Sequence, residues 1–379
     1  MCAKITHMDA KGLGKRIQEA RVSAGVSQED VRKYLDLGDR TAVSRIESGD
    51  RRVTAVEMFA LAELLNRPLQ WFVAEPVPAL ISRRTDAGYD PEITKHLDED
   101  VSLLADDVRF LQRKKLLNFM VHFHRWSPPL THADAERIAR EARRSVGMGD
   151  EPISNVGATC EKFGMYIYFA QYGKDNGDGA CVDIESDDRA ETGSVASAAA
   201  AVVNGSQPIA RVRMTAIHEL AHRLVGDVYD RHSSDSETMV KSLAVHILAP
   251  RTGVSRLWYA HPGDSERTRA IRVAGTYQIS WTALVSQLRN LDLISFEARD
   301  QLAREYPKPS EFAALQIELP GDLTSPQLSP ALAAAAVRGY DDAKITRNRA
   351  LRILRGSISD TDLRPREDRP FTVVGGTSS

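Results

Sequence analysis

The stretch RVRMTAIHELAHRLVGD, residues 211–227, contains two histidines four positions apart, with a glutamate directly after the first. In an α-helix, residues i and i+4 lie on one face, so His218 and His222 can both reach a single metal ion. Glu219 is turned about 100° from His218, where a carboxylate can take a proton from a zinc-bound water. The spacing therefore predicts a helix and a hydrolytic zinc site. The alternative is a buried amphipathic helix that contains histidines by chance.

Two histidines do not complete such a site, because catalytic zinc usually takes three protein ligands and keeps one position open. The third histidine of a metzincin would fall at position 228, which is a valine. His232 lies in the polar stretch YDRHSSDS, where an exposed histidine without a ligand role is the simpler interpretation. Glu237 opens a predicted helix whose apolar face can pack on the first helix, whereas His246 lies about 180° around it. We therefore expect Glu237 to be the third ligand of a His-His-Glu site.

The segments VVNGSQPIARVRMTAIHELAHRLVG and SETMVKSLAVHILAP resemble the ImmA/IrrE family of zinc metallopeptidases. The matching positions are Asn204, Arg213, Thr215, His218, Glu219, His222, Glu237 and Pro250. The resemblance covers about residues 135–300 and implies an α+β, zincin-like metallopeptidase domain that binds zinc. Four positions depart from the family pattern. Met214 and Ile217 are conservative changes, whereas Arg223 is charged where a neutral residue is usual and Lys241 stands where asparagine is common.

Nearer the N-terminus, SQEDVRKYLDLGDRTAVSRIESGDRR has the layout of a helix-turn-helix. Ser27 is a predicted N-cap of the first helix, Gly38 is expected to allow the tight turn, and Asp39 is expected to cap the second helix. Val31, Leu35, Val43 and Ile46 would face inward. The solvent face of the second helix then carries Arg40, Thr41, Ser44 and Arg45, and Gln28 begins the preceding helix.

A helix of this kind can enter a major groove by its N-terminal end, where arginine suits guanine and Gln28 could contact a phosphate. Charge alone is weak support, because residues 1–73 carry twelve Lys and Arg against ten Asp and Glu, a net charge of +2. The pattern over roughly 60 residues resembles the phage-repressor (Xre) class of DNA-binding domain. That resemblance implies that Arg40, Thr41 and Arg45 read bases and that the protein works as a homodimer on paired half-sites. A protein-binding role is the alternative.

The net charge, the cysteines and the lengths of the apolar runs limit the partners and the cellular location that we expect. The net charge of −2 offers no whole-chain argument for nucleic acid or membrane. Cys2, Cys160 and Cys181 form no CxxC pair, which favours a reducing, cytoplasmic location over a disulfide framework. No apolar run approaches 18 residues, so no membrane partner is expected.

Three stretches between residues 165 and 203 have the short periodicity of strands, while helical patterns dominate elsewhere. We therefore predict a mostly α fold, with an all-α helix-turn-helix bundle, an α+β metallopeptidase domain with a small sheet, and a helical C-terminal region. The predicted divisions are 8–73 for the DNA-binding domain, 74–130 for a linker and a helix that connects or dimerises, 131–305 for the metallopeptidase domain, 306–365 for the helical region and 366–379 for a disordered tail.

Together these features predict a DNA-binding transcriptional regulator with a zinc-dependent peptidase that uses Glu219 as general base. By resemblance, it would hydrolyse a peptide bond in a repressor-type partner or in itself. Its expected partners are operator DNA, for example at its own promoter, and a protein encoded nearby. The alternatives are a non-cleaving DNA-bound regulator and an antitoxin or defence component whose zinc domain binds a partner protein.

Overall fold

The computed structural model describes residues 9–366 apart from 40, 66, 68, 70–71, 73–90, 119–123, 175–176, 190–194 and 226–233. Its contacts divide the chain into two units, Met1–Pro78 and Ala79–Ser379. No helix within the described ranges is both long enough and apolar enough to cross a membrane. The predicted tail after residue 366 and the predicted linker at 74–90 lie outside the described residues.

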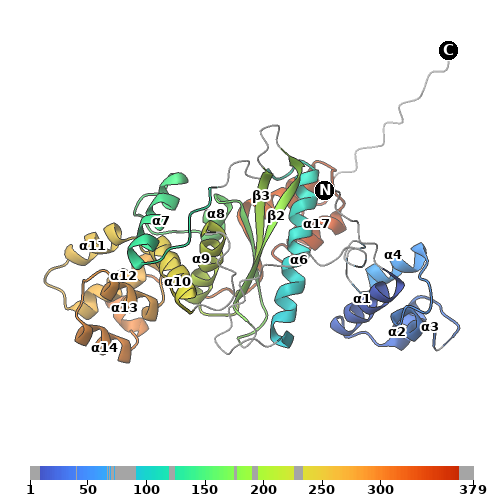
Figure 1. Cartoon of the computed structure of the whole chain (residues 1–379), viewed down its shortest axis with the longest axis horizontal. Coiled ribbons are helices and arrows are strands. Elements are labelled where there is room, and N and C mark those ends of the chain that lie inside the picture. The colour runs from blue at the N-terminus through green and yellow to red at the C-terminus, as the bar shows by residue number, and fades with distance from the viewer. Residues whose placement is uncertain are drawn as a thin grey trace, which may run out of the picture. The chain divides into compact units, whose positions relative to one another are not determined.

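The first unit is a small helical bundle, as the sequence predicts (Figure 1). Its helices include α1 (Ala10–Ser23), α2 (Gln28–Tyr34), α3 (Ala42–Glu47) and α4 (Ala55–Leu64). Ser27 and Thr54 form capping boxes at the starts of α2 and α4, which satisfy backbone N–H groups that lack partners within the helix. The core joins residues from all four helices, among them Ile17, Val31 and Leu61.

Two details of the helix-turn-helix differ from the sequence prediction. Gly38 does not have a positive φ; the left-handed residue of the turn is Asp36, with φ of 51°. Aspartate is one of the few side chains that tolerate this region, because it can hydrogen-bond locally. The helix α3 begins at Ala42, and its N-cap is Thr41 rather than Asp39. Asp39 precedes the cap, and its side chain accepts a hydrogen bond from the Thr41 backbone N–H at 2.8 Å.

The second unit is a mixed sheet covered by helices on both faces (Figure 1). The strands are β1 (Met165–Ala170), β2 (Gly179–Arg189), β3 (Val195–Asn204) and β4 (Gln327–Leu328), in the order β2-β3-β1-β4. β1 runs parallel to β3, whereas β2 pairs antiparallel with β3 and β4 pairs antiparallel with β1. The three strands expected from residues 165–203 are therefore confirmed.

The helices of this unit are α6 (Pro91–Arg113), α7 (His132–Ser145), α8 (Val156–Glu161), α9 (Ile209–Val225), α10 (Ser234–Leu248), α11 (Arg251–Tyr259), α12 (Glu266–Tyr277), α13 (Trp281–Asn290), α14 (Phe296–Arg304), α15 (Pro309–Ala314), α16 (Pro330–Asp341) and α17 (Arg347–Leu354). Alternate residues of the strands face opposite sides, as the two-residue period of a strand requires. One face shares a core with α7–α10, α12 and α13, and the other shares a core with α6, α16 and α17.

The segment expected to connect the domains or to dimerise has a further structural role. α6 begins at Pro91, inside the stretch we read as linker, and packs on the sheet through Leu97, Val101, Leu104 and Val108. The alanines at positions 198–201 of β3 are buried on both faces of the strand, so helices approach the sheet closely from each side. The mostly α fold with a helix-turn-helix and a small sheet is confirmed.

Candidate metal centre and DNA-reading surface

α9 lies between the sheet and α10, and every residue from Val212 to Val225 is buried. A helix that is buried all round is normally apolar, yet this one carries two histidines and a glutamate inside the protein. α10 packs against it, and the predicted inward face of α10, formed by Val240, Ala244 and Leu248, is fully buried in the same core. This packing brings Glu237, one turn before Val240, over the histidine face of α9.

The three side chains predicted as metal ligands lie together. His218 Nε2 is 3.0 Å from Glu237 Oε1, and His222 Nε2 is 3.4 Å from Glu237 Oε2. The two imidazole Nε2 atoms are 3.1 Å apart, and their rings meet nearly at right angles. An ion held tetrahedrally by nitrogen and oxygen at about 2.0–2.1 Å requires ligand atoms about 3.3–3.4 Å apart. The donor set and its spacing therefore fit zinc.

The site has a buried side and a side open to solvent. His218 and His222 are almost fully buried, while the Glu237 side chain is 40% exposed. Burial by itself raises the pKa of Glu237, but hydrogen bonds and charge interactions with His218 and His222 outweigh it and hold the pKa well below its usual range. Lys241, one turn further along α10, places Nζ 3.8 Å from Glu237 Oε1 with its side chain 45% exposed.

Glu219 is completely buried, and its carboxylate lies near the first residue of strand β2. A Cβ built on Gly179, the first residue of β2, would lie 3.6 Å from Glu219 Oε1. Burial raises the pKa of the neighbouring Cys181 thiol, and the Glu219 carboxylate raises it further. Glu219 therefore occupies a narrow space between α9 and the start of β2. Sequence reasoning missed Gly179, because no local pattern reveals which strand meets the helix.

Arg223, next to His222, is also buried. Its guanidinium donates to the backbone carbonyls of Phe163 and Ala198, at 3.1 and 3.0 Å, and pairs with Asp183 on β2. Burial lowers the pKa of Arg223, and the Asp183 charge opposes that shift. The charged residue that departs from the family pattern thus fixes α9 against the sheet. Sequence reasoning had no signal for Asp183.

Other predicted positions also have structural roles. Asn204 ends β3 and donates through Nδ2 to the carbonyls of Gly173 and Gly177, which closes the loop before β2. Arg213 donates to the carbonyls of Ile153 and Gln278. Val228 and His232 lie outside the described residues. His246 is buried beside Gln287, whose Nε2 lies 2.9 Å from His246 Nδ1, away from the ligand group.

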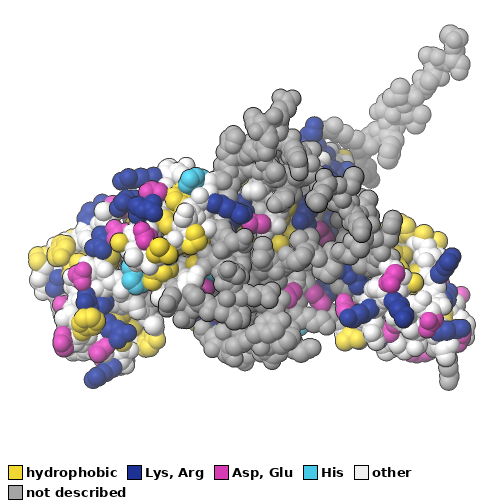
Figure 2. Space-filling model, in the orientation of Figure 1, with side chains coloured by type: hydrophobic (Ala, Val, Ile, Leu, Met, Phe, Trp, Pro, Cys, Tyr) yellow, Lys and Arg dark blue, Asp and Glu magenta, His cyan; other side chains and the backbone are white. Residues whose placement is uncertain are grey.

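In the first unit, Thr41, Ser44 and Arg45 are exposed along α3, while Val43 and Ile46 are buried. Arg40 lies outside the described residues. Arg45 pairs with Asp39. On the visible face of this unit, basic and acidic side chains are interspersed (Figure 2). α3 therefore presents polar and basic groups to solvent, with no dominant positive patch on that face.

Gln28 is exposed, and its Nε2 donates to Glu47 Oε2 at 2.6 Å. Glu47 also receives Arg21 at 2.6 Å and is itself buried. The side chain at the start of α2 is thus held by an acceptor at the end of α3, which links the two helices of the motif. Its position is compatible with a contact to a phosphate, since it remains accessible to solvent.

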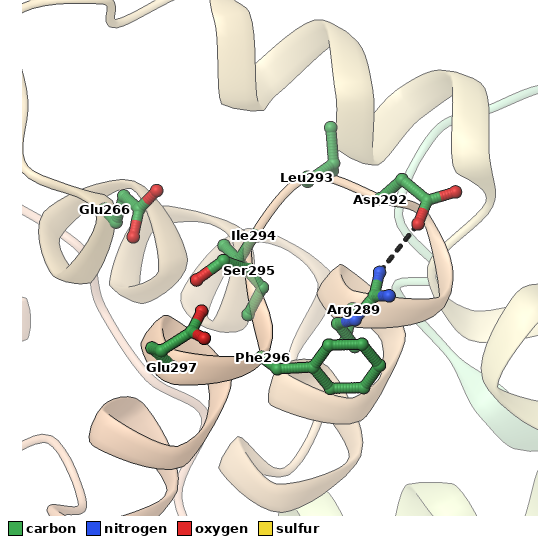
Figure 3. Close-up of a pocket in the computed structure, with 8 residues that line it drawn as sticks. All are labelled: Glu266, Arg289, Asp292, Leu293, Ile294, Ser295, Phe296 and Glu297. Atoms are coloured by element: carbon green, nitrogen blue, oxygen red, sulfur yellow. Dashed lines mark hydrogen bonds and ion pairs between the residues drawn. The ribbon is translucent and has the colours of Figure 1, made fainter.

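A pocket of about 430 Å³ lies between the start of α12 and the α13–α14 connection (Figure 3). It is lined by the carboxylates Glu266, Asp292 and Glu297, and by Arg289, which pairs with Asp292 at 2.6 Å. None of the predicted site residues lines it. We therefore do not regard it as part of either candidate site.

Comparison with known proteins gives one match. The family model for helix-turn-helix domains matches residues 17–72, the span that contains α2 and α3. No curated protein and no solved structure matches the chain. The first unit is thus a helix-turn-helix domain of the kind that binds DNA, as expected for a DNA-binding regulator.

Proposed function

We propose that the chain is a DNA-binding transcriptional regulator whose second unit is a zinc-dependent metallopeptidase. The observation that carries the peptidase proposal is the convergence of His218, His222 and Glu237, whose metal-binding atoms lie within 4.8 Å of one another. The resemblance of these segments to the ImmA/IrrE family supports the same assignment. The substrate would be a repressor-type partner encoded nearby or the chain itself.

His218, His222 and Glu237 would hold the zinc ion. When bound, zinc polarises a peptide carbonyl and lowers the pKa of water. Glu219 follows His218 directly and does not belong to the ligand group, and it would be the general base that accepts a proton from the attacking water. It would then return that proton to the leaving amine. A purely structural metal site would need only the three ligands, so Glu219 favours catalysis.

A peptide substrate is supported by the strand beside Glu219. β2 is at the end of the strand order and pairs only with β3 among the described strands. An edge strand offers unpaired backbone N–H and C=O groups, to which an extended peptide can add as a further strand. Since β2 begins at Gly179, next to Glu219, a peptide bound along it would pass close to the proposed base.

For the DNA-binding unit, we propose that α3 enters the major groove. Thr41 and Ser44 can hydrogen-bond to base edges, and Arg45 can donate two hydrogen bonds to guanine. Arg40, which precedes them, is proposed as a further base contact and Gln28 as a phosphate contact. Domains of this class read paired half-sites as dimers, so we propose a homodimer on operator DNA, for example at the protein's own promoter.

The experiment compares wild type with Glu219→Gln, each co-expressed with the protein encoded by the adjacent gene. We expect the wild type to cleave that protein or itself, and Glu219→Gln to retain zinc but to leave both chains intact by mass spectrometry. Glu297→Gln on α14 removes the same charge outside the metal centre and should cleave normally. Cleavage by Glu219→Gln would refute the assigned base.

A wild type that binds zinc and DNA but cleaves neither chain would refute the peptidase proposal. Co-purification of the adjacent protein with that wild type would then support the second candidate, a non-cleaving regulator or antitoxin-like protein. In that protein, the zinc domain would bind a partner.

A further inference from the structure

Asp39 lies two residues before Thr41, the N-cap of the helix that is proposed to contact DNA. Its Oδ1 accepts from the Thr41 backbone N–H at 2.8 Å and from Thr41 Oγ1 at 2.9 Å. Its Oδ2 pairs with the Arg45 guanidinium through Nη2. The carboxylate is thus fixed at the start of α3 by Thr41 and holds Arg45, one turn further on.

We propose that Asp39 is a positioning residue for base recognition, whose carboxylate holds the Arg45 guanidinium ready to select guanine. This inference rests on the proposed role of α3 in reading DNA. It concerns how one base contact is made specific.

The geometry of the pair leaves Arg45 able to bind a base. A guanidinium has five N–H donors in a planar fork, and the contact with Asp39 uses Nη2. Recognition of guanine needs two donors, directed to O6 and N7. A free arginine side chain populates many rotamers, so an anchor at one nitrogen reduces the conformational entropy that binding would otherwise cost. The side chain of Arg45 is 52% exposed, which leaves room for a base edge.

The charge of Asp39 should favour specificity over affinity. Phosphates attract arginine irrespective of sequence and repel a carboxylate. Because Asp39 balances the charge of Arg45, the pair adds little to sequence-independent attraction. The hydrogen bonds from Thr41 lower the pKa of Asp39, so the carboxylate is ionised at neutral pH. Without this anchor, Arg45 can rotate onto a phosphate, where it contributes affinity without sequence information.

The test uses the full chain and a pool of randomised DNA duplexes. The sequence selected by the wild type defines the operator, and each guanine in it is then replaced singly for affinity measurements at constant salt. Asp39→Asn keeps an oxygen that can accept the Thr41 N–H but loses the charge. Asp36→Asn, in the turn after α2, loses the same charge away from α3 and serves as the matched control.

We expect Asp39→Asn to lower the preference for guanine at one position about tenfold, with affinity for unrelated DNA unchanged or increased. Asp36→Asn should leave the preference intact. In an Arg45→Ala background, Asp39→Asn should have no further effect at that position, because its effect acts through Arg45. Asp39→Ser, which keeps a capping hydroxyl, provides a second neutral variant if the asparagine variant does not fold.

An unchanged guanine preference in folded Asp39→Asn or Asp39→Ser overturns this inference and leaves the DNA-reading role of α3 standing. An equal loss in the Arg45→Ala background also overturns it, since that would indicate only a structural role in starting the helix. A wild type that selects no sequence at all refutes the proposed role of α3 and this inference with it.

Discussion

Replacing Gly179 with alanine tests how closely strand β2 approaches the helix that carries the proposed metal ligands. A Cβ at position 179 would lie 2.8 Å from Thr215 Cγ2 and 3.2 Å from the carbonyl oxygen of Val202. Carbon atoms in contact are normally about 3.5–4.0 Å apart. Thr215 and Val202 are fully buried, so neither can move away into solvent. The added methyl must therefore push β2 away from α9.

The expected cost follows from these distances. One extra methyl in a closely packed core typically costs about 1–3 kcal/mol. Thr215→Ser removes the atom that the new methyl meets, and it costs about 1 kcal/mol by itself because a buried methyl is lost. In the double variant, the alanine methyl occupies the vacated space. The two substitutions should therefore cost less together than the sum of their separate costs, with a coupling of about 1–2 kcal/mol.

The assay is urea unfolding followed by tryptophan fluorescence. Three of the four tryptophans, Trp126, Trp258 and Trp281, belong to the second unit and report on its unfolding. Zinc content and cleavage are measured on the same samples, since a displaced β2 also disturbs the space around Glu219. An unchanged urea midpoint in Gly179→Ala would refute the close approach of β2. A failure of Thr215→Ser to restore stability would show that the clash lies elsewhere.

Four further predictions concern other parts of the molecule. Glu237→Gln should weaken zinc binding at least tenfold, measured by competition with a chromogenic chelator, because it replaces an anionic ligand with an amide. Lys241→Gln should strengthen zinc binding roughly three- to tenfold in the same assay, because it removes a cation beside Glu237. Burial lowers the pKa of His246 to about 4, from 6.5, so the unfolded chain takes up this proton first as the pH falls. The wild-type free energy of unfolding that depends on the neutral His246 ring is fully present above pH 6.5, and about 3 kcal/mol of it is lost as the pH falls to 4. The urea midpoint of His246→Asn should therefore fall less over this pH range than that of the wild type. Arg45→Ala should weaken binding to the selected operator by about 1–3 kcal/mol in a fluorescence anisotropy titration, and an unchanged affinity would remove it from the proposed contacts.

Features that lie within one helix were the most predictable from sequence. His218 and His222 share a face because the period of the helix places them there, whatever surrounds it. The N-cap at Ser27 was also predictable, because the capping side chain and the acidic residues of the first turn lie within four residues of sequence. Placing Glu237 over the histidines needed a packing argument about a second helix, and the apolar face of α10 supplied it. The structure brings these three side chains together.

Features that depend on contacts between distant segments were not predictable in this way. The sequence of α6 shows an amphipathic helix but does not say which surface covers its apolar face, and that surface is the sheet. Gly38 was expected to allow the tight turn because glycine adopts unusual backbone conformations at low cost, yet the residue with a positive φ is Asp36. Short loops allow more than one residue to take the positive φ, and the packing of the flanking helices selects between them.

Arg223 and Lys241, the two charged positions that differ from the pattern the sequence resembles, contact different parts of the second unit. The guanidinium of Arg223 is buried and donates hydrogen bonds to two backbone carbonyls and to Asp183, so these partners compensate its positive charge inside the protein. Lys241 is exposed and adjoins Glu237, so its charge acts on any cation or substrate that enters the site. Neutralising Arg223 would leave buried carbonyls without donors and should destabilise the second unit. Neutralising Lys241 should leave stability unchanged and alter zinc affinity, because its contact with Glu237 is exposed and contributes little to folding.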